Sequence, residues 1–310
     1  MFFEGSEKKF ELSVVAGVSS LREIPRAIYD ECVEKSEAQI LSVVSSDQCD
    51  AYLLSESSLF VWDDRITMIT CGNTKLCHAA LFIIDHLGQD NVESFFYERK
   101  NEYYPRKQSS DFFDDVECLS KKINGTAYRL GQPNQHHLYL FHGNKKYEPP
   151  KSDRTIELLM YGLSGEANEI FSKPNNNSQS IREFLNLENA FPGFKFDDYV
   201  FSPVGYSCNA VKGSDYYTIH VTPQDEGPYV SFETNVKGMT AKSVVESVTN
   251  IFKPSCFDII QFDSGQLEDI QFAGPRKLNA VKDKIGGYNV LFKSYYNHSE
   301  DYKKADKLKL

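Results

Sequence analysis

Apolar and polar positions alternate along this chain in short runs, a pattern that predicts many strands and few helices. The expected strands cover residues 10–18, 40–44, 51–62, 65–71, 92–97, 137–141, 155–161, 199–203, 216–222, 229–233, 257–262 and 288–292. Apolar residues at helical spacing predict helices over 75–87, 110–122, 180–187 and 241–252. We therefore expect a strand-rich α+β fold.

One order of elements occurs twice in this prediction. Residues 51–87 and residues 216–252 each read as strand, turn, strand and helix. Two similar halves, each a sheet backed by helices, would make a layered α+β sandwich. The identity between the two stretches is too low to demonstrate a repeat, so the two halves stay a prediction from the pattern.

The composition argues against several classes of protein. Of 310 residues, 41% are hydrophobic and 25% are charged, as in a globular protein with a large core. No apolar run reaches the ~18 residues that span a bilayer, and the N-terminus lacks the features of a signal peptide. The net charge of −10 is opposite to the basic surplus of nucleic-acid binders. Seven cysteines without a C-x-x-C pair argue against a disulfide framework or a zinc site. We expect a cytoplasmic protein with reduced thiols that binds neither membrane nor nucleic acid.

Four local features are candidates for chemistry, and each has a plain structural alternative. Polar residues 55–58 interrupt an apolar strand run, either as buried groups with a task or as a bulge at a strand end. Cys71 precedes a helix, where it is either a proton donor or nucleophile or a small buried hydrophobic residue. His220 lies among β-branched residues, as an acid–base group or a satisfied core histidine. Glu7 and Glu11 share one face of the first strand, for which a solvated face is the default interpretation.

These features belong to a longer series of motifs in one order. The series is Phe3-Glu4-Gly5-x-Glu7-Lys8, Tyr52-x-Leu54-Ser55-Glu56-Ser57-Ser58-x-Phe60-Val61, Thr70-Cys71-Gly72-x-Thr74, Ser94-Phe95-Phe96-Tyr97-x-Arg99-Lys100-Asn101, Gly205-Tyr206-Ser207-x-Asn209, Thr218-Ile219-His220-x-Thr222-Pro223 and Tyr229-Val230-Ser231-Phe232-Glu233-Thr234-Asn235. On these seven motifs the chain resembles the eukaryotic S-adenosylmethionine decarboxylase proenzyme family. The resemblance implies one domain over residues 1–310. Its fold would be a four-layer αββα sandwich, with two antiparallel sheets face to face and helices outside.

The resemblance also implies that the chain cuts itself between Glu56 and Ser57. The Ser57 hydroxyl would attack the Glu56 carbonyl, and β-elimination would then separate a β chain, 1–56, from an α chain, 57–310, that begins with a pyruvoyl group. The pyruvoyl carbonyl, joined to the substrate amine as a Schiff base, would be the electron sink that decarboxylation needs, without pyridoxal phosphate or metal. The substrate would be S-adenosylmethionine, and its decarboxylated form would donate aminopropyl groups in spermidine and spermine biosynthesis.

The same resemblance assigns roles to single residues. Cys71 would reprotonate the substrate α-carbon, and His220 would accept a proton during processing, assisted by Ser207. The remaining members of the implied site are Glu4 and Glu7, which assist catalysis, Phe3 and Phe201, which sandwich the adenine ring, and Leu54, Glu56 and Gln224, which contact the substrate.

A second site, for the diamine putrescine, is implied by the animal branch of the family, in which putrescine is an activator. The matching positions are Glu11, Asp153, Thr155, Glu157 and Glu233. Three of them alternate along one strand and so share a face, and buried carboxylates need a counter-cation such as a diamine. An ordinary acidic strand is the alternative. Members of the family occur as monomers and as dimers, and we expect a dimer of αβ units.

Two positions depart from the family pattern. Gln224 stands where most relatives have a glutamate that holds the ribose hydroxyls, and Ile69 stands where animal relatives carry a lysine that links the effector site to the active site. The loss of that lysine leaves the acidic cluster short of a cation, and it implies tighter diamine dependence, constitutive behaviour or a damaged enzyme. Two other functions are a catalytically poor paralogue that activates a partner subunit as a heterodimer, and an adenosyl-ligand-binding module without chemistry. Five retained residues favour an active enzyme: Glu56, Ser57, Cys71, Ser207 and His220.

Overall fold

The protein forms two eight-stranded antiparallel sheets in a computed structural model that describes residues 7–174, 176–223 and 228–297. The first sheet contains β1 (Lys8–Val14), β2 (Ile40–Ser45), β3 (Asp50–Leu54), β4 (Ser57–Val61), β5 (Arg65–Thr70), β6 (Val92–Lys100), β7 (Gly125–Gly131) and β8 (His137–Gly143). The second sheet contains β9 (Arg154–Tyr161), β10 (Lys195–Val200), β11 (Tyr206–Lys212), β12 (Asp215–Thr222), β13 (Tyr229–Thr234), β14 (Cys256–Asp263), β15 (Arg276–Ile285) and β16 (Tyr288–Tyr296).

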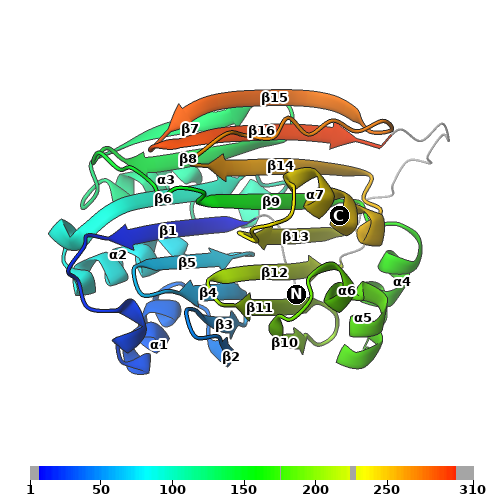
Figure 1. The fold of residues 1–310 in the computed structure, drawn as a ribbon, viewed down its shortest axis with the longest axis horizontal. Coiled ribbons are helices and arrows are strands. Elements are labelled where there is room, and N and C mark those ends of the chain that lie inside the picture. The colour runs from blue at the N-terminus through cyan, green and yellow to red at the C-terminus, as the bar shows by residue number, and fades with distance from the viewer. Residues whose placement is uncertain (1–6, 175, 224–227, 298–310) are drawn as a thin grey trace.

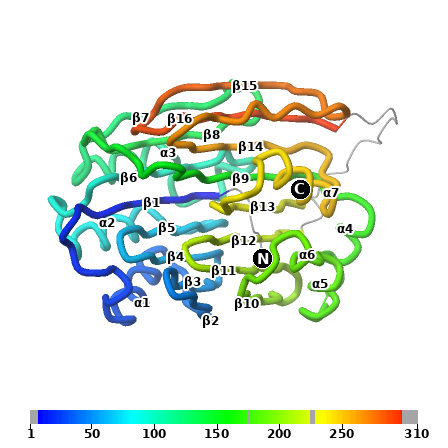
Figure 2. Tube along the Cα trace, in the orientation of Figure 1, coloured from blue at the N-terminus to red at the C-terminus, as the bar shows by residue number. Residues whose placement is uncertain are grey.

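The two sheets share one topology. The strand order is β2-β3-β4-β5-β1-β6-β8-β7 in the first sheet and β10-β11-β12-β13-β9-β14-β16-β15 in the second. Each label of the second order is eight higher than the label at the same place in the first (Figure 1). The chain completes the first sheet before it begins the second, as the change of colour along the trace shows (Figure 2). The two similar halves predicted from the repeated order of elements are therefore present.

Helices cover the outer face of each sheet, as the predicted αββα sandwich requires. They are α1 (Arg26–Lys35), α2 (Leu76–Leu87), α3 (Phe112–Leu119), α4 (Gly165–Ser172), α5 (Ser178–Leu185), α6 (Leu187–Ala190) and α7 (Ala241–Phe252), with short 3-10 turns η1 (Leu21–Glu23), η2 (Gln89–Asn91) and η3 (Pro105–Lys107). Helices α1–α3 lie with the first half and α4–α7 with the second (Figure 1). None of the described helices is both long and apolar enough to cross a membrane.

Each outer layer is held to its sheet by a separate apolar core. Phe10 and Leu12 of β1 pack in one cluster with Ile83 of α2. In the second half, Phe232 of β13 and Val248 of α7 belong to the corresponding cluster. Burial of each such side chain contributes about 1.5–3 kcal/mol, so the two outer cores hold the helices in place.

The layer between the two sheets is different, because it contains buried charge as well as apolar contacts. One apolar cluster joins Phe96 of β6 to Tyr288 of β16, and another joins Phe60 and Trp62 near β4 to Tyr216 of β12. Polar and charged residues with at most 9% exposure also lie on strands of both sheets; they include Lys9, Ser58, Glu98, Asp153, Glu157, Asn209, Thr218 and Glu233. Of the residues predicted from the sequence, Asp153, Glu157 and Glu233 belong to this inner layer.

The predicted strand over 51–62 is wrong as a single strand, because it is a hairpin of β3 and β4 with a turn at Ser55 and Glu56. The predicted strand over 199–203 is also misplaced: β10 ends at Val200. Pro203 has no N–H to donate to a strand ladder, and Gly205, at φ 124°, turns the chain into β11. The helix predicted over 241–252 is confirmed at both ends as α7.

Candidate active site

The predicted cleavage point lies at the tip of the β3–β4 hairpin. Leu54 and Ser57 are opposite each other in the ladder, so Ser55 and Glu56 form a two-residue turn. Such turns normally place positive φ angles at the turn residues, but here the positive φ, 135°, falls on Ser57. A side chain is strained in this region of backbone space. The strain therefore lies on the residue whose N-terminal peptide bond is predicted to break.

The carbonyl group of Glu56 is held by a backbone donor from β5. The Cys71 N–H donates to the Glu56 oxygen at 3.0 Å, just beyond the ladder pair of Ser57 with Thr70. A hydrogen bond to a carbonyl oxygen stabilises the negative charge that develops there during nucleophilic attack. The hairpin thus presents a carbonyl that is already oriented and polarised.

Three side chains from different strands form a hydrogen-bonded line beside this carbonyl. Ser207 of β11 and His220 of β12 are paired in the ladder, and Ser207 Oγ lies 2.6 Å from His220 Nδ1. On the other side of the ring, His220 Nε2 lies 3.1 Å from Cys71 Sγ. The three side chains, at most 7% exposed, are thus brought together from the two sheets.

Burial keeps both members of the Cys71–His220 pair uncharged. It lowers the pKa of His220 to about 4. Burial, followed by the charges of Glu56 and Glu7, raises the pKa of the Cys71 thiol well above its usual value. A thiol of this kind is a proton donor rather than a thiolate nucleophile, and a neutral imidazole keeps one nitrogen lone pair free to accept a proton.

Two carboxyl groups next to this line have raised pKa values. Burial raises the pKa of Glu56 to about 7, against the opposing charge of Lys8. Glu7 is half-buried, and burial of its carboxyl group raises its pKa to about 8, against a hydrogen bond with Ser231. Both groups therefore titrate near neutral pH.

Of the predicted substrate-binding residues, Leu54, Glu56 and Phe201 are described by the structure. The ring of Phe201 stands edge-on to the ring of His220 with the centroids 6.4 Å apart. The Leu54 side chain is fully buried in the outer core of the first half, so its predicted contact with the substrate stays a prediction. Phe3, Glu4 and Gln224 lie outside the described residues, so their predicted roles stay predictions.

Sequence reasoning missed two residues that support the site. Lys8 Nζ donates to the carbonyl oxygens of Gly72 and Thr74 at 2.8 and 3.1 Å, and so fixes the segment after Cys71. Asn209 Oδ1 accepts from the Ser58 hydroxyl at 2.6 Å, which ties the hairpin of the first sheet to β11 of the second. Both residues stand inside the motifs of the sequence, next to the candidates that were chosen.

The predicted putrescine residues lie between the sheets and already have cationic partners. Arg65 donates to both carboxylate oxygens of Asp153, at 3.2 and 2.6 Å, and lies 3.7 Å from Glu11. Lys9 Nζ lies 2.7 Å from Glu157 and 3.1 Å from Glu233. The expectation that the loss of a lysine at Ile69 leaves this cluster short of a cation is therefore wrong, because Lys9 lies directly opposite Ile69 in the β1–β5 ladder.

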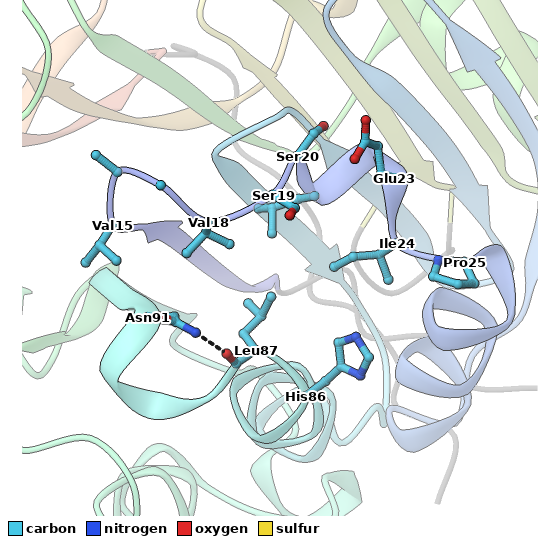
Figure 3. A pocket seen from close by; sticks show the side chains of 13 residues that line it. Val15, Val18, Ser19, Ser20, Glu23, Ile24, Pro25, His86, Leu87 and Asn91 are labelled. Atoms are coloured by element: carbon cyan, nitrogen blue, oxygen red, sulfur yellow. Dashed lines mark hydrogen bonds between the residues drawn. The ribbon is translucent and has the colours of Figure 1, made fainter.

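Two other features lie apart from this group. A hollow of about 670 Å³ is lined by residues 15–21, 23–25, 86, 87 and 91 (Figure 3), and Glu23 and His86 are its only titratable lining residues within the described chain. Its size therefore does not locate the chemistry. Among the described residues, Cys77, His78 and Cys118 bring ligand atoms within 4.8 Å of one another where α2 meets α3, although their sequence spacing showed no metal motif. None of the three belongs to the Ser207–His220–Cys71 line.

A two-sheet sandwich with acid–base side chains at the seam between its sheets defines an α+β enzyme that acts from its inner layer. The chain belongs to the adenosylmethionine decarboxylase family, whose model matches residues 1–305. It is similar to the S-adenosylmethionine decarboxylase proenzyme of Xenopus laevis, at 36% identity over 95% of each chain. The proenzyme of Drosophila melanogaster is 31% identical over 96% of each chain, and that of Dictyostelium discoideum is 32% identical over 94% of this chain and 85% of its own.

A solved structure supports the same fold. The Trypanosoma brucei AdoMetDC-delta26 monomer superposes with a TM-score of 0.61 at 23% identity, over 78% of this chain and 99% of that one. The resemblance seen in the seven motifs is thus confirmed, and with it the expectation of a decarboxylase of the proenzyme type.

Proposed function

We propose that this chain cleaves itself between Glu56 and Ser57 and then decarboxylates S-adenosylmethionine, to supply an aminopropyl donor for polyamine synthesis. The observation that carries the proposal is the position of Ser57, which has a strained φ of 135° and follows a carbonyl held by the Cys71 N–H. The family and the relatives' names support the substrate class.

The processing steps follow from residues of the chain itself. The Ser57 hydroxyl adds to the Glu56 carbonyl carbon, the Cys71 N–H stabilises the oxyanion, and the C–N bond breaks to leave an ester and a free amine on residue 57. Loss of the Ser57 α-proton to neutral His220 then breaks the Cβ–O bond. The first chain leaves with a Glu56 carboxylate, and water converts the dehydroalanine at residue 57 to a pyruvoyl group and ammonia.

The residues around position 57 suit a small carbonyl group formed there. Ser57 is 2% exposed, which protects such a group from competing reactions with water. A pyruvoyl group would supply the electron sink that decarboxylation requires. Cys71, as a buried thiol, would hold the proton for the substrate α-carbon. Glu56, and Glu7 once it is deprotonated above its raised pKa of about 8, would provide negative charge for the sulfonium substrate.

The test is a denaturing intact-mass measurement of freshly purified protein. A mass of 35.4 kDa divided in the ratio of 56 to 254 residues gives chains of about 6.4 and 29 kDa, of which the larger lacks a free amino terminus. Ser57→Ala removes the attacking hydroxyl and leaves one uncut chain without decarboxylase activity. Ser55→Ala, in the same turn, is the matched control and keeps cleavage. An uncut wild-type chain would contradict the proposal and favour the regulatory paralogue.

A diamine effector and a dimer are the remaining implications of the resemblance, and both stay predictions. A diamine at Glu157 and Glu233 would have to share these carboxylates with Lys9. A dimer is compatible with open sheet edges at β7 and β15, where Leu278 is 46% exposed.

A further inference from the structure

A buried ion cluster joins the two sheets at the centre of the sandwich. Lys9 of β1 and Glu98 of β6 are cross-strand partners in the first sheet, and Glu157 of β9 and Glu233 of β13 are cross-strand partners in the second. Lys9 Nζ lies 2.7 Å from Glu157, 3.1 Å from Glu233 and 3.7 Å from Glu98. The four residues, here called the Lys9 cluster, are each no more than 5% exposed.

The Lys9 cluster needs a cation to be stable. Two carboxylates directly opposite each other in a ladder repel, and buried charges are tolerated only when they are paired. Burial lowers the pKa of Lys9, but Glu157, Glu233 and Glu98 outweigh this and raise it well above its usual value, so the amine stays charged. Lys9 is therefore a permanent ammonium ion between the two sheets.

One ammonium ion is enough for this cluster, because its carboxyl groups do not all carry full charge. Burial raises the pKa of Glu98 well above its usual value, and one of its carboxyl oxygens has no hydrogen-bond partner among the described residues. Burial also raises the pKa of Glu233 to about 7, against the charge of Lys9. Near neutral pH, much of the negative charge is thus removed by protonation.

The hollow beside the Lys9 side chain is too small for a second amine. The space enclosed by the Lys9 side chain, Glu11, Glu98 and Thr155 holds about 10 Å³, while a single water molecule needs roughly 10–15 Å³. The other two predicted effector carboxylates, Glu11 and Asp153, already face Arg65. Each carboxylate of the predicted diamine site therefore has a cation from this chain.

We propose that Lys9 is a built-in counter-ion that takes the place of a soluble diamine, so that this enzyme is processed and active without one. The lysine side chain is itself a four-carbon stem that ends in an ammonium group, which is the chemistry of one end of putrescine. The proposal deepens the proposed function and rests on it for the activity measurements, although diamine binding can be tested without them.

Lys9 is also connected to the active site through Glu7, which lies two residues earlier in the chain. Glu7 and Lys9 are two residues apart and point to the same side. The charged and titratable groups that act on Glu7 come from several segments: Glu233 of β13, Glu157 of β9, Lys9, and Cys71 and Tyr229 through their own ionisation. The charge of Lys9 lowers the pKa of Glu7, so Lys9 acts as a positioning residue through its neighbours and not by contact with substrate.

The test compares the wild-type protein with Lys9→Ala, which removes a propylammonium group. Processing and decarboxylation are followed with no amine, with putrescine, with n-propylamine and with n-propanol. We expect the wild-type rates to change less than about twofold in every case, and the rates of Lys9→Ala to fall about tenfold because buried carboxylates lose their cation. Putrescine and propylamine should restore the Lys9→Ala rates, and propanol should not.

Two controls separate this role from a general loss of structure. Lys293→Met removes another buried lysine, whose ammonium group donates to the Ile270 carbonyl at 2.8 Å in the second half, and amines should not affect its rates. Lys9→Arg keeps the charge and should remain independent of diamine. In Lys9→Ala the rise of activity with pH should move to higher pH, because Glu7 and Glu233 lose a neighbouring cation; a purely structural defect would lower activity at every pH equally.

Calorimetry with putrescine gives a result that does not depend on catalysis. Binding to Lys9→Ala but not to the wild-type protein supports the proposal even if the chain never decarboxylates S-adenosylmethionine, in which case only the proposed function fails. Tight binding to the wild-type protein, or activation of it more than about threefold, overturns the proposal. So does a soluble Lys9→Ala protein that keeps full activity or that no amine restores. If Lys9→Ala is insoluble, the wild-type titration still decides.

Discussion

At the scale of single residues, burial determines which side chains of the site are protonated. His220 is kept neutral and the Cys71 thiol is kept protonated by the same low-dielectric surroundings. This inverts the usual cysteine–histidine pair of a hydrolase, in which the charged form is stabilised. Here one ring nitrogen of His220 keeps an unprotonated lone pair that can take a proton, although both nitrogens are hydrogen-bonded, and the Cys71 sulfur retains a proton to give.

The depressed pKa of His220 predicts a specific loss of stability in acid. The unfolded histidine binds a proton below its ordinary value of 6.5, while the folded one does so only near 4. The difference of 2.5 units lowers the free energy of unfolding by about 3 kcal/mol as pH falls from 6.5 to 4, and nothing is lost above 6.5. Denaturant midpoints at pH 7 and 4.5 measure this loss in the uncut Ser57→Ala background.

His220→Gln is the comparison for that measurement, because it removes the titrating ring. The midpoint of Ser57→Ala should fall more steeply with acid than that of the double variant. Equal slopes would show that His220 is solvated or already charged in the folded protein.

At the scale of elements, the cleaved hairpin is positioned by the opposite sheet. Asn209 of β11 accepts hydrogen bonds from Ser58 and Thr218 at 2.6 and 2.8 Å and donates to the Tyr52 carbonyl at 3.1 Å. β3 and β4 are therefore attached to β11 and β12, which carry Ser207 and His220. The strained turn and the acid–base line are aligned by one amide side chain.

Asn209→Ala should therefore impair processing more than its effect on stability explains. The variant removes the amide partner of the Ser58 and Thr218 hydroxyls, which keep only each other at 3.2 Å, and of the Tyr52 carbonyl. This lowers the free energy of unfolding by about 1–3 kcal/mol, and the loosened hairpin should slow cleavage about tenfold or more. The rate is read from the appearance of the two chains by mass spectrometry. Ser42→Ala is the control, because it also removes a hydrogen bond between the sheets, from Ser42 to Asp197, but at their outer edge. Equal rates in both variants would refute the alignment role.

The elements also show what the sequence pattern could and could not predict. Helix α7 was placed correctly because its buried valines keep strict helical spacing. Strands β7 and β15 were missed because they are edge strands with a single buried residue each, which leaves little apolar pattern to detect. β11 was missed for the opposite reason, since it is buried on both faces over residues 206–211. Helix α1 was not predicted, although Tyr29, Cys32 and Val33 are spaced for one helix face and could have indicated it.

The residues of the site were easier to predict than the contacts between them. Cys71, Ser207 and His220 could be named from their motifs, but the contact between them depends on the facing of two sheets that are distant in sequence. The role of Lys9 could not be read at all, because its partners Glu157 and Glu233 lie about 150 and more than 220 positions away along the chain. Ile69 replaces a lysine of the relatives, and Lys9 lies opposite it on the neighbouring strand. This relation can be recognised only when the pairing of β1 with β5 is known.

At the scale of the whole molecule, the predicted cut does not separate two bodies. The first 56 residues contribute β1, β2, β3 and α1, and β1 lies between β5 and β6 inside the first sheet. We therefore expect the two chains to stay together after cleavage. Native mass spectrometry should show particles with equal numbers of both chains, one of each or, as the dimer prediction requires, two of each. Free 29 kDa chain under native conditions would contradict this expectation.

The matching strand orders of the two sheets have a historical consequence. Such a match is what duplication and fusion of a half-length gene would leave behind, and a half-length ancestor could have buried its inner face only against a second copy of itself. That ancestor would have carried equivalent hairpins on both copies. In the present chain the β3–β4 hairpin holds Ser57, while the counterpart between β11 and β12 lies where the Trp62 indole donates to the Ser214 carbonyl at 3.1 Å. Once fused, the two copies could diverge, one hairpin retaining the chemistry and the other becoming part of the scaffold.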